Sequence, residues 1–474
     1  MDGFDKEVFR RLPLAAAALS LFNYALNEPF LDQLFAEHRG RGYDGLLSFA
    51  TFVSLIRDAL LVHGGHGLPA FIKARERGQL PVLPRSVYPK LARIELAVSK
   101  ALLRESSQKM LGLMEESCPS PLPASLAAFT TITLDGKTLK HVRRQLKSLR
   151  SLRGKLLGGK LLVAQDLASG LALAFAASED GHTNEIRLAQ DLLGQIQSMN
   201  AVLSKPRLWM ADAQFCDLNL MGHFSNDGGH FLIRYNRTLN FEPDASRPLQ
   251  TGTDAKGRFF SQQWGWVGGV KDKRRCYVRQ IRLLRADADE LILLTNLLDP
   301  LAYPVIDLLE TYLLRWGIEQ MFQSVTEVFC LRQLIGCTPK ANIFQASFCL
   351  VIYDAIVVMR SYVAAAGNVT PEQVSTAKFF DDVQEELIAH QKLGTMDSVS
   401  ETMAKVKTAI QMKDLLNDLL GDCWHERWLK AKSNQRRPRG PSQYNRAGHT
   451  SVFKAMNQYR ERHKTANLTE GQRR

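Results

Sequence analysis

A run of apolar and β-branched residues, Phe129-Thr-Thr-Ile-Thr-Leu134, stops at the pair Asp135-Gly136. A run of this kind, bounded by turn residues, is typical of a buried β-strand. Aspartate is common where a core strand turns, so Asp135 alone has an ordinary structural explanation. A carboxylate at a strand end is also held rigidly, as a catalytic or metal-binding group must be.

The residues that follow predict three more strands and one helix. Apolar runs at 161–164, 171–175 and 207–211 predict the strands, and 183–197 predicts a helix with Glu185 in its first turn. The last strand stops at Asp212, as the first stops at Asp135. The predicted order is therefore β-β-β-α-β, and the matching positions of the two aspartates favour a shared site over two unrelated turns.

A third acidic residue lies on a helix predicted over 304–328, after a short apolar strand at 291–295. Tyr312, Arg315 and Glu319 are spaced i, i+3 and i+7, so they share one helix face. Glu319 lies beside the apolar stripe of this helix, where a carboxylate can reach toward a sheet. The alternative is an ordinary Arg315–Glu319 pair on a solvated helix.

Three carboxylates on rigid elements suit the cleavage of phosphodiesters. Two Mg²⁺ ions about 3.5–4 Å apart can activate an oxygen nucleophile and neutralise the transition state. Hard divalent ions prefer carboxylate oxygens. We therefore predict that Asp135, Asp212 and Glu319 converge as catalytic and metal-binding residues.

Together these motifs resemble the DDE transposases of the insertion-sequence-four type. That family carries Y-x2-R-x3-E-x6-K on the helix of its third acid, and this chain reads Tyr312-Leu-Leu-Arg315-Trp-Gly-Ile-Glu319. The stretches TLDGKT around Asp135 and MADAQF around Asp212 resemble the first and second acid motifs of the family. The resemblance runs in order over residues 40–345.

The chain departs from this family at one position. The final lysine of the pattern falls at Thr326. Arg332 and Lys340 are nearby basic residues that could replace it.

The resemblance implies a mixed α/β fold with an RNase H-like catalytic core and two Mg²⁺ ions, for which Mn²⁺ would substitute. It implies a transposase that binds the inverted repeats at transposon ends, nicks their 3′ ends with water, and transfers the freed 3′-OH to target DNA. Tyr312 and Arg315 would contact the end DNA. An aromatic residue of a β-rich insertion can stack on a flipped base, and Trp264 and Trp266 are candidates, with a packed strand residue as the alternative for each.

The charge of the chain also favours nucleic acid as a partner. Lys and Arg outnumber Asp and Glu by 61 to 48, a net charge of +13, which suits a polyanion. Nine basic residues and no acid lie between Gly136 and Lys160. This stretch is predicted to bind phosphates without reading sequence, with a solvated loop as the alternative. Its predicted DNA-binding residues are Lys137, Lys140, Arg143, Arg144 and Lys147.

These observations predict six segments. They are a helical N-terminal DNA-binding domain (1–120), the RNase H-like core in two parts (128–228 and 291–345), a β-rich insertion (229–290), a helical C-terminal region (346–430) and a basic, disordered tail (431–474). The stretch 346–363 is apolar but contains Asp354 and Arg360. It is therefore predicted to be a buried helix and not a membrane span.

Other features narrow the class of protein. The seven scattered cysteines include no C-x-x-C pair, which disfavours a disulfide framework or zinc site and fits a reducing compartment. We expect no signal peptide, because the N-terminus begins with the acidic residues Asp2 and Asp5. We expect a bacterial cytoplasmic location, with the nucleoid when DNA is bound. Walker A and GxSxG motifs are missing from the sequence, so no nucleotide cofactor or membrane partner is expected, and a homodimer is expected on DNA.

Three hypotheses follow from the sequence. The first is a DNA transposase. The second is a metal-dependent nuclease with the same core that does not transfer strands, and the third is a non-catalytic DNA-binding protein descended from a transposase. The intact acids disfavour the third hypothesis, whereas Thr326 keeps it open.

Overall fold

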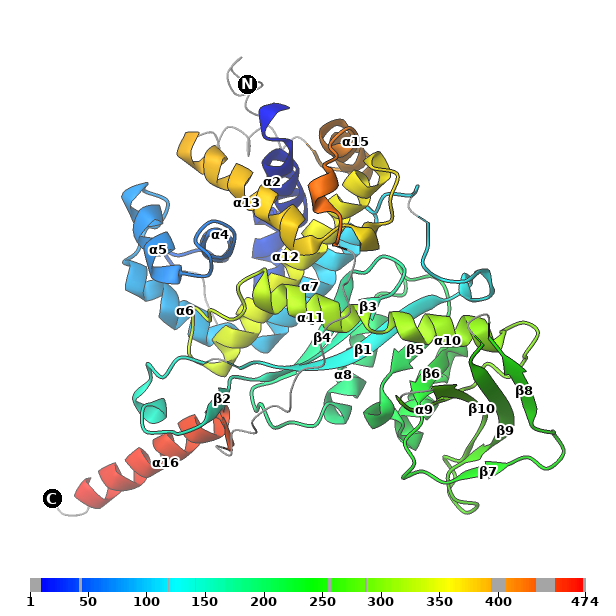
Figure 1. Cartoon of the computed structure of the whole chain (residues 1–474). Coiled ribbons are helices and arrows are strands. Elements are labelled where there is room, and N and C mark those ends of the chain that lie inside the picture. The colour runs from blue at the N-terminus through cyan, green and yellow to red at the C-terminus, as the bar shows by residue number, and fades with distance from the viewer. Residues whose placement is uncertain are drawn as a thin grey trace.

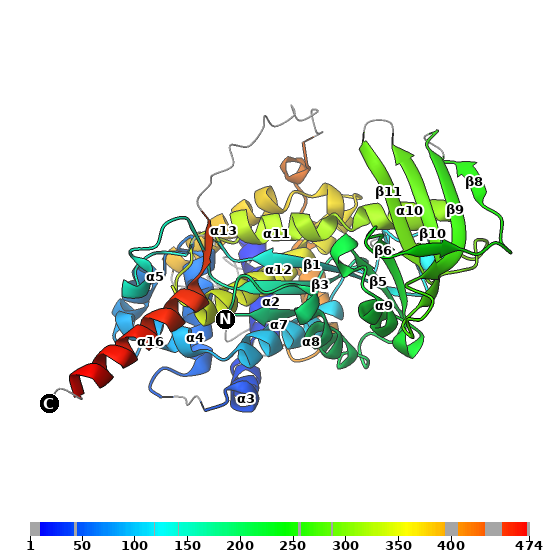
Figure 2. The ribbon, with the colours of Figure 1, turned by 90° about the horizontal axis from the view of Figure 1, so that it is seen from below.

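The computed structural model describes residues 10–41, 45–117, 119–140, 142–254, 257–285, 288–393, 406–431 and 448–471. Within these residues the centre of the molecule is one mixed sheet of ten strands in the order β4-β3-β1-β5-β6-β11-β10-β9-β7, with β8 paired to β9. Helices lie on both sides of it (Figures 1 and 2). The strands are β1 (Thr130–Thr138), β3 (Lys160–Asp166), β4 (Ala172–Ser178), β5 (Arg207–Ala211), β6 (His230–Arg234), β7 (Phe241–Pro243), β8 (Gln250–Thr253), β9 (Phe259–Val267), β10 (Cys276–Arg285) and β11 (Ala288–Thr295).

Five strands form the core of the sheet, and four of them are the core strands that the sequence predicts. β1 lies between β3, which is antiparallel to it, and β5, which is parallel to it, while β4 and β6 flank these two. Ile132 and Leu134 pack with helix α8 (Ile186–Gln197) on one face of the sheet. Because strand side chains alternate between faces, the odd-numbered residues of β1 face the other side. The order β1-β3-β4-α8-β5 confirms the mixed α/β, RNase H-like fold class.

The β-rich insertion was expected to be separate from the core sheet, but its strands continue that sheet. The fifth core strand is β6, within the predicted insertion, and it runs parallel to β5. β11, which was predicted to be the next core strand, pairs antiparallel with β6 and leads to β10 and β9. The edge of β6 would otherwise present unpaired backbone groups, so the insertion extends the core sheet (Figure 2).

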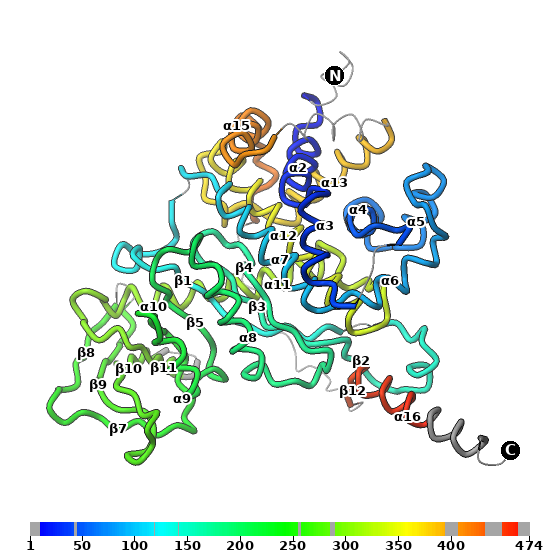
Figure 3. The backbone as a smooth tube through the Cα atoms, turned by 180° about the vertical axis from the view of Figure 1, so that it is seen from behind, coloured from blue at the N-terminus to red at the C-terminus, as the bar shows by residue number. Residues whose placement is uncertain are grey.

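The N-terminal helices are confirmed, but they do not form a core of their own. They share one hydrophobic core with α12 (Pro339–Ala366), the later helices and one face of β3 and β4 (Figure 3). Val98 and Leu102 are buried on α7, which packs on α12 and β4. The proline-rich segment at 119–123 therefore does not separate two cores. The other helices of this layer are α2 (Pro13–Ala25), α3 (Glu28–His38), α4 (Phe49–Leu61), α5 (Gly67–Glu76), α6 (Val87–Arg93), α7 (Leu96–Leu111), α13 (Thr376–Leu393) and α15 (Ala409–Leu420).

The apolar helix α12 is a core element, as predicted. It is long and apolar enough to cross a membrane, yet its most apolar window is entirely buried within the protein. Asp354 is satisfied there by the Ser107 hydroxyl at 2.9 Å and the Ala172 backbone N–H at 2.8 Å. Arg360 donates to the Thr376 hydroxyl at 2.9 Å.

Two helices predicted to be continuous are broken. Apolar residues at helical spacing over 86–102 predict one helix, but this segment divides into α6 and α7 because Ile94 has an extended ψ of 124°. The predicted helix over 304–328 divides into α10 (Val305–Leu314) and α11 (Gly317–Glu327). At this second break, Arg315 and Trp316 keep helical dihedrals, but the amides of Ile318 and Glu319 bond three residues back instead of four.

The tail is not wholly disordered, in contrast to the prediction for 431–474. β12 (His449–Ser451) pairs in parallel with β2 (Lys155–Leu157), and α16 (Val452–Gly471) follows it. Val452 and Ala455 are buried, so apolar contact with the basic stretch after β1 anchors this part of the tail. The arginine-rich run at 436–441 lies outside the described residues. A short helix, α9 (Leu218–Phe224), completes the core beside β5 and β6.

Candidate active site

Asp135 and Asp212 lie at the same level of two adjacent parallel strands. Thr133 of β1 is opposite Met210 of β5, and Asp135 and Asp212 come two residues further along each strand. Neighbouring strands are about 4.8 Å apart, so this register brings the two aspartates together. Asp135 does not end its strand as predicted, because pairing with β3 continues β1 to Thr138.

Both aspartates are on the face of the sheet that α10 and α11 cover. Leu208 and Met210 of β5 pack with α10 on this face, and Asp212 continues that alternation. α11 packs on β1. The structure thus places the first two acidic residues beneath the two helices that carry the third motif.

The carboxyl group of Asp135 is in an unfavourable setting for its charge. Burial raises its pKa from 3.8 to about 6, and the nearby carboxylates of Glu185 and Asp212 add to this rise. A hydrogen bond from the Gly136 amide at 2.8 Å and the positive charge of Arg315 oppose it. Asp212 is partly exposed and caps the following turn by accepting from the Gln214 amide at 3.0 Å.

The residues of the third motif surround Arg315. Tyr312 is 6% exposed, and its hydroxyl donates to the carbonyl of Ala211, directly before Asp212, at 3.3 Å. The guanidinium of Arg315 lies 5.8 Å from the Tyr312 ring and bonds the Glu319 carboxylate at 3.3 Å. Tyr312 therefore anchors the end of β5, while Arg315 lies between Asp135 and Glu319.

The predicted convergence of three acids is shown for two of them. Asp135 and Asp212 come together, but Glu319 is 36% exposed and paired with Arg315. Among the described residues, no three Asp, Glu, His or Cys side chains are grouped as a metal ion requires. The Arg315 guanidinium holds the Glu319 carboxylate, so the role of Glu319 as third metal ligand stays a prediction.

Glu185 is a fourth acidic residue at this site, and its position in the sequence did not predict a role there. It is 8% exposed, forms an ion pair with Lys160 of β3, and accepts a hydrogen bond from Gln214. A Cβ at position 136 would overlap the Glu185 carboxylate, so a residue larger than glycine would force that carboxylate to move. Glu185 thus links β3 to the turn after Asp212, and it does so from the opposite face of the sheet. The sequence signal that could have identified it is an acidic residue directly before α8.

The two tryptophans predicted to stack on DNA have different environments. Trp264 is 2% exposed, and its indole N–H donates to the Leu298 carbonyl at 2.9 Å. It therefore has the packed role that was the alternative. Trp266 is 40% exposed, lies against Tyr277 and has the Arg275 guanidinium 5.0 Å from its ring. Its accessible indole keeps the stacking prediction open for Trp266.

The basic residues after Asp135 fall into two groups. Lys137 and Lys140 line a cavity beside Asp135 and Thr326. Farther along, Arg143, Arg144 and Lys147 are exposed, and Arg144 bonds the carbonyls of Leu152 and Gly154.

The two expected replacements for a lysine at position 326 lie elsewhere. Lys340 is paired with Glu95 at 2.8 Å, whereas Arg332 is 62% exposed and 4.0 Å from Glu327. Neither residue lines the cavity beside Thr326. The structure thus gives no support to either replacement.

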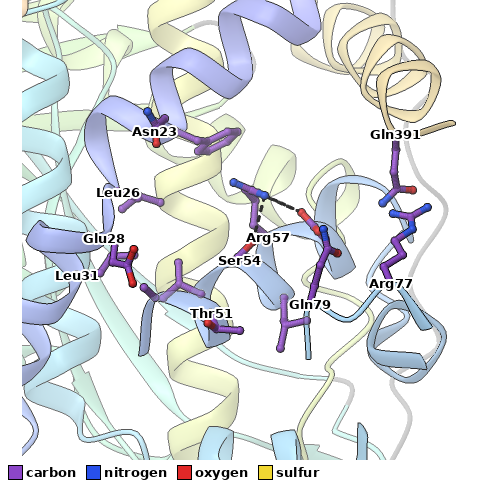
Figure 4. Close-up of a pocket in the computed structure, with 15 residues that line it drawn as sticks. Asn23, Leu26, Glu28, Leu31, Thr51, Ser54, Arg57, Arg77, Gln79 and Gln391 are labelled. Atoms are coloured by element: carbon purple, nitrogen blue, oxygen red, sulfur yellow. Dashed lines mark hydrogen bonds and ion pairs between the residues drawn. The ribbon is translucent and has the colours of Figure 1, made fainter. Parts of the chain in front are cut away.

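A separate cavity of about 350 Å³ lies in the helical layer (Figure 4). Its lining residues include Phe22 of α2, Leu26 directly after α2, Arg57 of α4 and Gln391 of α13. Arg57 is satisfied there by Asp58 at 3.1 Å and Ser54 at 3.2 Å. None of the residues of the acidic site lines this cavity.

Comparison with known proteins gives one family match. Residues 129–354, which include all three predicted catalytic acids, match the family model described as the transposase DDE domain. Among solved structures, the chain is similar to the piggyBac transposase in a synaptic complex with hairpin DNA, at 12% identity and a TM-score of 0.37 over 85% of each chain. No curated protein gives a significant match.

Proposed function

We propose that this chain, which contains a transposase DDE domain at residues 129–354, cuts and rejoins DNA at the ends of an insertion sequence. The domain implies DNA transposition by polynucleotidyl transfer. The proposal includes that the protein is of the insertion-sequence-four type, binds terminal repeats and carries out strand transfer. The observation that carries it is the matched register of Asp135 and Asp212 beneath helices that bear Arg315 and Glu319.

The two aspartates fit a hard divalent cation. Their carboxylates come from rigid neighbouring strands, and burial beside other acids raises the pKa of Asp135 to about 6. Such a carboxyl gains most from a cation that stabilises its charged form. Asp135 and Asp212 would hold the ion and Glu319 would be the third ligand. When bound, two Mg²⁺ ions supply an activated oxygen nucleophile and stabilise the transition state.

Arg315 positions the DNA in this proposal. Its guanidinium is 15% exposed and makes a single 3.3 Å contact with Glu319. A DNA phosphate can accept two parallel hydrogen bonds from a guanidinium, so it competes well for Arg315. Binding of the phosphate would release the Glu319 carboxylate beside the aspartates. Tyr312 keeps Asp212 in place through the carbonyl of Ala211.

The decisive test separates binding from cutting. The probe is an end duplex, taken from inverted repeats in the DNA that brackets the coding sequence, and the variant is Asp212→Ala. We expect this variant to lose nicking and to bind the duplex as well as the wild type or better, because it removes a charge that repels phosphate. Nicking by Asp212→Ala at the wild-type rate would exclude the proposed site.

The same assay distinguishes the alternative functions. Nicking with transfer of the 3′ end to a second duplex supports the transposase, whereas nicking alone indicates the nuclease. Specific binding without either reaction indicates a DNA-binding protein. A homodimer on the end duplex and a cytoplasmic, nucleoid-associated location belong to the proposal, and light scattering of the complex and cell fractionation test them.

A further inference from the structure

A cavity of about 250 Å³ begins at Gly136, the residue after Asp135, along β1. β5 pairs with β1 at Thr130–Thr133 and not beyond, which leaves the edge from Asp135 onward accessible. The volume corresponds to about eight water molecules of ~30 Å³ each, enough for a phosphodiester group. We call this cavity the lysine pocket; its walls are Gly136, Lys137, Thr138, Leu139, Lys140, Lys160, Thr326 and Leu331.

The lysine pocket has an excess of positive charge. Lys160 is neutralised by Glu185 and also donates to the Thr138 hydroxyl at 3.1 Å. Lys137 and Lys140 form no ion pair with any residue that the structure describes. The ammonium of Lys137 lies 5.5 Å from the centre of the Phe322 ring.

The wall opposite the lysines carries no charge. It is formed by Thr326 of α11 and by Leu331. The Thr326 hydroxyl donates to the carbonyl of Phe322, one turn earlier, at 2.6 Å. The cations that line the pocket therefore come from β1, β3 and the segment that follows β1, and not from α11.

The position of the pocket relates it to the reacting phosphate. Lys137 is two residues beyond Asp135 and on the same face of β1, a distance of about 6.6 Å along the strand. Thr326 is two helical turns beyond Glu319, or about 10 Å along α11. A DNA strand that passes Asp135 and Glu319 between β1 and α11 reaches the pocket within a few phosphates.

We propose that the lysine pocket binds one backbone phosphate of the DNA strand that is cut, through Lys137 and Lys140. This inference rests on the proposed function for the identity of the DNA and adds a subsite to it. The pocket differs from the exposed residues Arg143, Arg144 and Lys147, which would contact DNA without fixing a particular phosphate.

The test is a binding scan of end duplexes that each carry one neutral methylphosphonate linkage near the cut. We expect wild-type binding to fall about tenfold at one linkage, the size of effect that loss of a charged hydrogen bond gives. The double variant Lys137→Gln/Lys140→Gln should bind the unmodified duplex about tenfold more weakly and lose its sensitivity to that linkage. The matched control Lys147→Gln, a basic residue of the same stretch outside the pocket, should keep the sensitivity.

A rescue experiment places the charge on the opposite wall. Adding Thr326→Lys to the double variant should restore both the affinity and the linkage sensitivity, whereas Gln323→Lys, on an exposed position of the same helix, should not. Equal linkage sensitivity in the wild type and the double variant, or rescue by Gln323→Lys alone, would overturn the proposal. The binding scan does not depend on nicking. A protein that binds the duplex without nicking it would refute the proposed function, and the scan would still test the lysine pocket.

A second arm distinguishes DNA phosphate from free phosphate. Inorganic phosphate is titrated against the wild type and the double variant in thermal unfolding. Weak stabilisation that needs far more phosphate than duplex agrees with the proposal. Stabilisation at low phosphate concentration, lost in the double variant and without any linkage effect on DNA, would assign the pocket to a free anion and overturn it.

Discussion

Replacing Asp135 by asparagine should stabilise the metal-free protein at alkaline pH. Burial, reinforced by neighbouring acids, raises the pKa of Asp135 from 3.8 to about 6. Two pKa units at 1.36 kcal/mol each amount to about 3 kcal/mol that the charged carboxylate costs the folded state. Asparagine has nearly the same shape and can still accept from the Gly136 amide, so it should recover most of this free energy.

The pH dependence fixes the sign of the effect. The carboxyl group ionises near pH 3.8 in the unfolded chain and near pH 6 in the folded protein. The folded state therefore binds the proton more tightly, and its stability falls as the pH rises from about 4 through 6. The gain in free energy of unfolding for Asp135→Asn should be near zero at pH 4 and about 3 kcal/mol at pH 8.

The measurement is urea unfolding of the wild type and Asp135→Asn at pH 4, 6 and 8 in the presence of EDTA. Asp244→Asn is the matched control, because hydrogen bonds from Ser246 and Tyr277 lower the pKa of Asp244 to about 2. That control should lower stability at pH 8 instead of raising it. A loss of stability in Asp135→Asn at pH 8, or the same change at pH 4 and pH 8, would refute the reasoning. Nicking should be abolished in Asp135→Asn throughout.

Two further substitutions test the surroundings of the aspartates. Arg315→Lys keeps the charge of a partly exposed ion pair worth about 0.3–0.5 kcal/mol, so the variant should stay folded. It should nevertheless slow single-turnover nicking about a hundredfold, because a phosphate misplaced by about 1 Å reacts poorly. Unfolding at a lower temperature, or nicking at the wild-type rate, would make Arg315 a structural residue. Glu185→Gln leaves the ammonium of Lys160 without its partner at a site where the side chains are 10% and 15% exposed, so urea unfolding should show a loss of about 3 kcal/mol. The double variant Glu185→Leu/Lys160→Met should recover much of that loss, and a double variant no more stable than the single one would contradict a buried ion pair.

Local patterns in the sequence were sufficient to locate many of the elements and to propose the acidic site. Alternation and β-branched residues located β1, and the acid after each of two apolar runs predicted Asp135 and Asp212 as a pair. These signals are readable because side-chain direction has a fixed period within a strand or helix. The same reasoning recognised α12 as a buried helix from Asp354 and Arg360, and the structure confirms it.

The tertiary structure decided which segments are partners. The register that places Asp135 beside Asp212, the joining of β11 to β6, and the shared core of the N-terminal helices with α12 all depend on contacts between distant parts of the chain. Glu185 reaches the site because α8 packs on the opposite face, and Lys137 shares a cavity with Thr326 because α11 lies on β1. Periodicity shows which face of an element is apolar, but the free energy of packing that face against one partner rather than another is determined only when the whole core forms.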